Sequence, residues 1–79
     1  MKALKTNVAG VDVHKDKLAI TIMIGAGDED AVVEHLECST MTDDLRACGI
    51  ILKEKGVRDV AMESTGVYWK PVYNVWEPL

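Results

Sequence analysis

Hydrophobic residues of this chain fall into short runs separated by polar segments, which is the pattern of β-strands rather than long helices. The runs are rich in valine and isoleucine, which favour strands; the first is typical of a buried strand, and the third alternates loosely between its two faces. The third run is the most polar, so we expect it near an edge of the sheet. The four predicted strands cover residues 6–14, 18–24, 31–38 and 57–63.

The segments between the first three strands have the composition of turns. Residues 14–17, His-Lys-Asp-Lys, are all polar and suit a hairpin. Residues 25–30 contain two glycines and three acids, which predicts a second, flexible turn.

A helix is predicted between the third and fourth strands. Thr42, followed by Asp43 and Asp44, marks its start, because the hydroxyl can cap free amides and the acids suit the positive end of the helix dipole. Gly56 is expected to cap its end. Gly49 lowers the helix stability by about 1 kcal/mol relative to alanine, so the helix needs to pack on the sheet. Its apolar stripe comprises Leu45, Cys48, Ile51 and Leu52.

Pro71 suits the first turn of a second helix, with Val72, Val75 and Trp76 on one side. The predicted order is therefore β-β-β-α-β-α. A strand–helix–strand crossover places the fourth strand parallel to an earlier one, most simply the first. Such a mixed α/β sheet is the opening of a ribonuclease-H-like fold, incomplete at the C-terminus, and residues 1–79 form the amino-terminal portion of that one domain.

Composition narrows the class of protein. Of the 79 residues, 48% are hydrophobic and 28% are charged, which is typical of a globular domain. No apolar run approaches the ~18 residues that span a membrane, and no export signal is found, so a cytoplasmic protein without a membrane partner is predicted. Cys38 and Cys48 are predicted to be buried thiols rather than a disulfide.

The formal net charge is −4, whereas isolated nucleic-acid-binding domains are usually basic. This negative net charge argues against strong nucleic-acid binding by these residues alone. It does not argue against a catalytic role, because metal-binding carboxylates add negative charge.

Two acids stand out by position. Asp12 lies inside an apolar strand, where a charge is costly unless it is paired or bound to metal, and Glu63 ends the strand predicted beside it. Carboxylates that converge at one end of a sheet can hold Mg²⁺, and two such ions about 4 Å apart activate water in phosphodiester cleavage. Two acids are too few for that pair of ions. A turn residue at Asp12 and a helix cap at Glu63 are the alternative interpretation.

Two motifs carry a family resemblance. Gly-Val-Asp-Val-His-Lys at 10–15 and Met-Glu-Ser-Thr-Gly-Val-Tyr-Trp at 62–69 resemble the leading motifs of the DEDD-type insertion-sequence transposases. These have a RuvC-like amino-terminal domain related to the invertase Piv. The match runs from about residue 7 to residue 77, and its second motif is the more specific one.

The resemblance implies a function that the residues alone do not. Asp12 and Glu63 would be the first two acids of the family's DEDD tetrad, acting as catalytic metal ligands for Mg²⁺ or Mn²⁺ in DNA strand cleavage and exchange. The family's two closing aspartates and its serine-bearing domain come later in its chains, so this chain is expected to be inactive alone. DNA is the implied partner, together with an element-encoded guide RNA in several members.

Residues around the two acids have weaker assignments. Lys15 is a candidate contact for phosphate. His14 is either an extra ligand or, as favoured for a turn histidine beside lysines, a solvated side chain. Ser64 and Thr65 are interpreted as helix-capping or backbone-satisfying residues, because no histidine base is placed near them. The aromatic residues are candidates for base stacking but are favoured as core or interface anchors: Tyr68, Trp69, Tyr73 and Trp76.

Two rival functions remain open at this point. The chain could be a non-catalytic, oligomerising remnant of a decayed element, or an actin-like ATPase lobe. The second rival is disfavoured because the turn at residues 14–17 lacks the glycines of a phosphate loop. A homo-oligomer, through an unpaired strand or exchange of the last helix, is expected because apolar surface would otherwise be exposed. The residues expected on that surface are Val11, Ile20, Ile22, Val60, Trp69, Val72 and Trp76.

Overall fold

A computed structural model describes residues 6–26, 30–64 and 66–79 of the chain. The elements follow one another in the predicted order, and residues 27–29 of the second predicted turn lie outside the described part. Neither described helix is long and apolar enough to cross a membrane. The elements are β1 (Thr6–Val13), β2 (Lys17–Ala26), β3 (Val32–Ser39), α1 (Thr42–Glu54), β4 (Val57–Ser64) and α2 (Trp69–Trp76).

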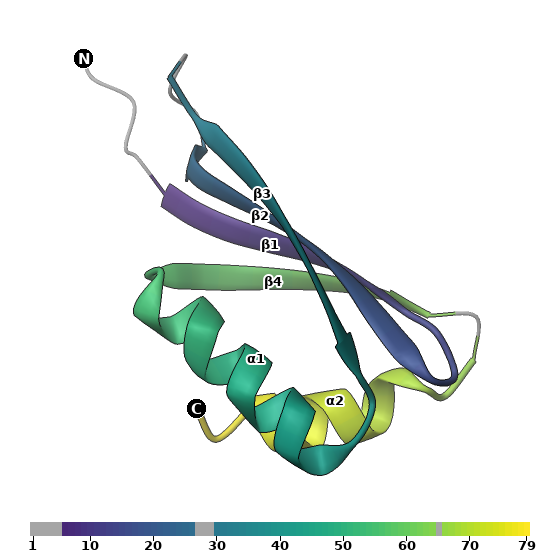
Figure 1. The fold of residues 1–79 in the computed structure, drawn as a ribbon. Helices are drawn as coiled ribbons and strands as arrows, with labels where there is room; N and C mark the ends of the chain where they lie inside the picture. Colours follow the sequence, from purple (N-terminus) through teal and green to yellow (C-terminus); the bar gives the residue numbers. More distant parts are fainter. Residues whose placement is uncertain (1–5, 27–29, 65) are drawn as a thin grey trace.

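The four described strands form one mixed sheet in the order β3-β2-β1-β4 (Figure 1). β1 pairs with β2, and β2 with β3, in antiparallel orientation, whereas β1 and β4 are parallel neighbours. The predicted parallel pairing of the first and fourth strands is therefore confirmed. The polar third strand lies at an edge, as its composition indicates. The molecule is a small mixed α/β structure.

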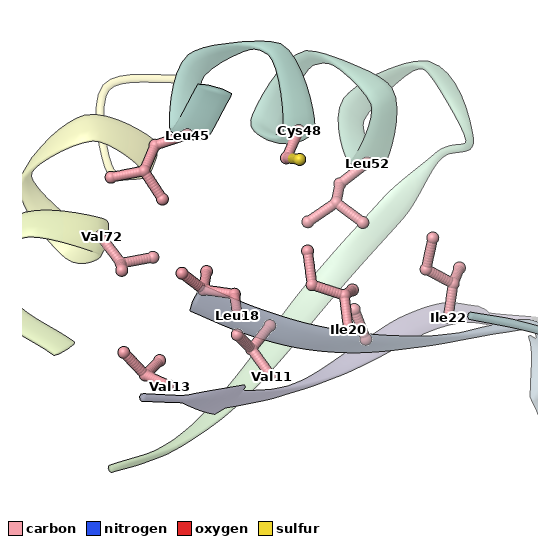
Figure 2. Packing of buried hydrophobic residues seen from close by; sticks show 10 residues of the cluster. Val11, Val13, Leu18, Ile20, Ile22, Leu45, Cys48, Leu52 and Val72 are labelled. Atoms are coloured by element: carbon pink, nitrogen blue, oxygen red, sulfur yellow. The ribbon is translucent and has the colours of Figure 1, made fainter. Parts of the chain in front are cut away.

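Both helices cover the same face of the sheet (Figure 1). Because side chains alternate along a strand, every second residue of β1 and β2 enters the core, where Leu45, Cys48 and Leu52 of α1 and Val72 of α2 meet them (Figure 2). The expected exposure of several of these residues is wrong, because the two helices suffice to cover this face. Val11, Ile20, Ile22 and Val72 are only 3%, 1%, 1% and 0% exposed.

The start of α1 differs from the prediction. Thr42 is the first helical residue rather than the cap, and the capping position belongs to Met41, which makes no side-chain cap hydrogen bond. The Ser39 hydroxyl instead accepts a hydrogen bond from the Met41 amide at 3.2 Å and donates one to the Asp44 carboxylate. The serine at the end of β3 thus makes the side-chain hydrogen bonds at the start of α1, because the turn brings its short side chain over the first helical residues.

The predicted end of α1 is confirmed at Gly56. This glycine has φ = 73°, a left-handed conformation that costs a side-chain-bearing residue free energy. Its amide donates to the Lys53 carbonyl at 3.0 Å. The Asn7 side-chain nitrogen would lie 3.2 Å from an added Cβ, and it donates to the Lys55 carbonyl at 2.6 Å. The helix therefore ends where β1 approaches it.

A second glycine, Gly49 within α1, allows α2 to pack closely against α1. The Trp76 ring lies against it, so that an added Cβ would stand 2.8 Å from Trp76 Cδ1 and 3.0 Å from Trp76 Nε1. The same ring nitrogen donates a hydrogen bond to the Leu45 carbonyl at 2.7 Å. The glycine that weakens α1 in isolation is thus the position at which α2 docks on it.

Both cysteines are free thiols that lie where β3 and α1 contact the core. Cys48 is 6% exposed, which confirms a buried thiol there, whereas Cys38 is half-buried. Burial raises the pKa of Cys38 to about 12, with smaller contributions from the Cys48 thiol and the Asp44 carboxylate. Cys38 is therefore protonated and weakly nucleophilic at neutral pH.

Candidate metal centre on the open face of the sheet

The two acids singled out by the sequence lie side by side. Asp12 and Glu63 are register partners on the parallel strands β1 and β4, each one residue before its strand ends. Paired residues on neighbouring strands project to the same face of a sheet. Both carboxylates therefore occupy one end and one face, as predicted.

That face is the one without helices. Val11 and Val13 enter the core, so Asp12 between them projects to the opposite, open side of the sheet. Its side chain is 59% exposed, and Glu63 is also exposed. The expected cost of an acid buried in an apolar strand is consequently wrong, because the alternation of the strand places the charge in solvent.

The histidine that follows β1 reaches the first acid. His14 is two residues after Asp12 and therefore falls on the same face, and its Nε2 lies 3.1 Å from Asp12 Oδ2. The His14 amide donates to the Lys17 carbonyl at 2.9 Å, which closes the predicted hairpin turn. The expectation of a solvated His14 is confirmed, since the side chain is 45% exposed, and the imidazole in addition contacts the Asp12 carboxylate.

Small residues surround the acids and leave the site open. The partner of Asp12 on β2 is Ala19, and the preceding row of the open face contains Gly10 paired with Ala61. A Cβ added at Gly10 would meet no atom within 4 Å. A large ligand can therefore approach both carboxylates from above the sheet.

Lys15 lies in the exposed hairpin turn next to the candidate centre. Its carbonyl accepts a hydrogen bond from the Thr40 hydroxyl at 3.3 Å, which links the turn to the residues that precede α1. The position of Lys15 is compatible with a contact to phosphate on the same end of the sheet.

Ser64 is the register partner of Val13, so it lies on the helix side of the sheet and not beside the two acids. Its hydroxyl accepts a hydrogen bond from the Gly66 amide at 3.4 Å, the backbone-satisfying role that was predicted. A helix-capping role for it is wrong, since α2 is capped at Tyr68 without a side-chain hydrogen bond. Thr65 lies outside the described residues.

An aromatic groove follows the outer side of β4, a feature that sequence analysis did not predict. Its volume is about 730 Å³. Trp69 and Tyr73 stand edge to face in its wall, with ring centroids 6.1 Å apart and planes at 76°. Both rings are exposed, at 40% and 47%, so only Trp76 fulfils the expectation of a core aromatic residue. The groove is lined by Val60, Met62, Glu63, Ser64, Gly66, Trp69 and Tyr73.

The capacity of the site for metal is limited by the number of ligands. Among residues 6–26, 30–64 and 66–79, no group of three or more His, Cys, Asp or Glu side chains is arranged to hold a metal ion. Asp12 and Glu63 supply oxygen ligands of the kind that Mg²⁺ and Mn²⁺ prefer. Two acids are fewer ligands than such a centre needs, so the described residues alone do not complete one.

Comparison with known proteins leaves the family open. No protein-family model matches the chain, and no curated protein matches it. The assignment of a function therefore depends on the two motifs and on the geometry of the residues in them.

Proposed function

We propose that the chain provides the first two acids of a metal-dependent DNA-cleaving centre of the RuvC-like, DEDD transposase type. One observation carries the proposal: Asp12 and Glu63, which lie 51 positions apart in sequence, are register partners on parallel strands and share an open face. The mixed sheet, with its first and fourth strands as neighbours, supports a ribonuclease-H-like fold.

Each residue of the centre has a distinct role in this proposal. Asp12 and Glu63 hold Mg²⁺ or Mn²⁺, and the bound cation supplies Lewis acidity at the scissile phosphate. His14, whose Nε2 lies 3.1 Å from Asp12 Oδ2, restricts the orientation of that carboxylate. Lys15 offers a positive charge to the phosphate backbone, which the net charge of −4 would otherwise repel. The substrate is DNA, and the reaction is the strand cleavage of transposition in the cytoplasm.

Cation binding is the direct test of this site. We expect Mn²⁺ added to the ¹⁵N-labelled chain to broaden the amide resonances around Asp12 and Glu63 first, because paramagnetic broadening is strongest near the ion. Asp12→Asn or Glu63→Gln each removes one ligand charge with little change of shape. Since loss of even an outer-shell partner costs a metal site about 10–100-fold in affinity, either variant should bind at least about tenfold more weakly.

Glu37→Gln is the matched control. Glu37 pairs with Ala19 in the same cross-strand row but lies beyond that alanine, on the far side from Glu63. Removal of its charge should leave Mn²⁺ binding unchanged. Broadening centred on Asp43 and Asp44 instead, or equal binding by both acid variants and the parent chain, would refute the assignment.

Activity provides the second readout. In a complete recombinase that contains this domain, Asp12→Asn or Glu63→Gln should abolish DNA strand cleavage while the far-ultraviolet circular dichroism stays unchanged. The 79-residue chain alone should not cut DNA with Mg²⁺ or Mn²⁺, because two carboxylates are too few to hold two ions. Cleavage at parental rate by either variant would remove these residues from the mechanism.

A non-catalytic, self-associating protein is the second candidate function. The exposed aromatic groove beside the edge strand β4 favours it, because soluble monomers rarely leave such rings uncovered. Its decisive difference from the first candidate is that it requires no cation at Asp12 and Glu63.

A further inference from the structure

The second acid of the candidate centre also borders the aromatic groove. Glu63 lines this groove together with Trp69 and Tyr73. β4 is an edge strand, with no further strand beyond it in the described part of the chain (Figure 1). A side chain near its end therefore reaches both the open face and the outer side of the sheet. A ligand held at the two acids can extend into the groove without crossing the sheet.

The groove offers two aromatic rings to a flat ligand. Trp69 is 40% and Tyr73 is 47% exposed. Their planes meet at 76°, so a ring stacked on one of them meets the other edge to face, and both arrangements are favourable. The volume of about 730 Å³ falls within the range of pockets that hold small organic ligands. The groove thus accommodates a nucleobase.

A basic hollow continues the aromatic groove along β4. It has a volume of about 220 Å³, and Val60 lines both cavities. The charged side chains among its described lining residues are Lys53 and Arg58, and both residues are exposed. Neither forms an ion pair within residues 6–26, 30–64 and 66–79. Ammonium and guanidinium groups without a carboxylate partner are suited to bind phosphate.

The alternation of β4 separates its charges. Arg58 lines the basic hollow with Val60 on the helix side, whereas Asp59 between them projects to the open face, as Glu63 does. The acid next to Arg58 in sequence therefore points away from the hollow. The negative charge of Glu63 lies at the far end of the groove, where the proposed cation would neutralise it.

We propose that the aromatic groove binds unpaired bases of the DNA strand next to the cleaved phosphate, and that the basic hollow holds a phosphate further along that strand. The inference rests on the proposed function and specifies its substrate. A base inside a duplex stacks on neighbours with both faces, whereas an unpaired base has a face free for an aromatic side chain. The substrate is therefore single-stranded, or locally unpaired, on one side of the cleaved bond.

The length of the track limits the number of bound nucleotides. Arg58 and Glu63 lie five residues apart on β4. At about 3.3 Å per residue this separation is about 17 Å. A stacked strand advances about 3.4 Å per nucleotide, so about five nucleotides connect the acids to the basic hollow.

Fluorescence anisotropy of a fluorescein-labelled thymidine pentanucleotide tests the stacking. The 79-residue chain is added up to about 1 mM in the presence of Mg²⁺, and a blunt, fully paired duplex serves as the competing probe. The single strand should bind more tightly than the duplex. Trp69→Ala should weaken its binding about 5- to 150-fold, the range expected for loss of one base–aromatic stack. Trp69→Phe keeps a ring and should keep most of the affinity.

Tyr68→Ala is the matched aromatic control. Tyr68 is 39% exposed and precedes Trp69 in sequence, but it does not line the groove or the basic hollow. Its removal should leave the affinity for the single strand unchanged. Circular dichroism of each variant verifies that the fold is retained.

Salt dependence tests the phosphate contacts. Arg58→Gln and Lys53→Gln should each reduce the slope of log affinity against log salt concentration by about 0.7, because each removes one phosphate contact of a single strand. Arg46→Gln is the control, since Arg46 pairs with Asp43 at 3.9 Å and lines neither cavity.

Mn²⁺ binding by the same variants separates this inference from the proposed function. If Mn²⁺ binds at Asp12 and Glu63 but Trp69→Ala leaves strand binding unchanged, or the duplex binds as tightly as the single strand, the inference is overturned and the proposed function stands. If Mn²⁺ does not bind there, the proposed function fails, and the placement of the strand fails with it. Self-association that Trp69→Ala abolishes and the oligonucleotide does not reverse would assign the rings to a protein contact.

Discussion

Gly49→Ala sets two well-defined effects against each other. In an isolated helix, alanine stabilises the α-helical state by about 1 kcal/mol relative to glycine. In this structure the added methyl group would stand 2.6 Å from Leu79 Cδ1, 2.8 Å from Trp76 Cδ1 and 3.0 Å from Trp76 Nε1. The leucine methyl is the end of a flexible side chain and can move. The indole is rigid, so its displacement decides the sign.

The size of the destabilisation follows from the packing and the hydrogen bond that the indole of Trp76 loses when it moves. Overpacking of a core costs typically 1–3 kcal/mol, and movement of the ring weakens the hydrogen bond from Trp76 Nε1 to the Leu45 carbonyl at 2.7 Å. Such a bond contributes about 0.5–1.5 kcal/mol. Subtraction of the helical gain of about 1 kcal/mol leaves a net destabilisation of about 0.5–3.5 kcal/mol.

Urea unfolding followed by tryptophan fluorescence and circular dichroism measures the change. A double-mutant cycle with Trp76→Val separates the two effects. Without the indole, Gly49→Ala should stabilise the chain by up to about 1 kcal/mol, so the sign of the effect reverses between the two backgrounds. Ala47→Gly, at an exposed position of α1, calibrates the helical contribution by itself.

A stabilised Gly49→Ala variant in the parent background would refute the reasoning. It would mean that α2 does not press on α1 at this glycine, and that the docking of Trp76 is looser than the structure shows. An additive cycle would have the same meaning.

Two further predictions concern other contacts of the core. Asn7→Asp should destabilise the chain by about 1–3 kcal/mol, because the Asn7 nitrogen donates to the Lys55 carbonyl at 2.6 Å and its oxygen accepts from the Gly25 amide at 2.9 Å, and a carboxylate cannot donate. An unchanged urea midpoint would contradict that account. Burial raises the pKa of Cys38 from 9.0 to about 12, so folding favours the protonated thiol. Its contribution to stability should be complete below pH 9 and lost as the pH rises toward 12. Cys38→Ser should flatten that decline, and equal slopes for both chains would show that the thiol is not protected.

The sequence by itself determined the order of the elements and their types, because runs rich in valine and isoleucine favour strands. Polar composition marked β3 as an edge, and the crossover through α1 made β4 parallel to β1. These features depend on neighbours in sequence, so local patterns suffice to predict them.

Tertiary structure decided which face of the sheet the helices cover and which side chains contact one another. The helices lie opposite Asp12, so the acid is solvated and not buried, and His14 turns back to contact it. No local pattern shows that Gly49 is the docking position of Trp76, because the preference of an isolated helix opposes glycine there. The free edge of β4 and its aromatic groove likewise arise only when segments far apart in sequence pack together. Packing between such segments outweighs local propensity, since it alone determines which surfaces lose their contact with water.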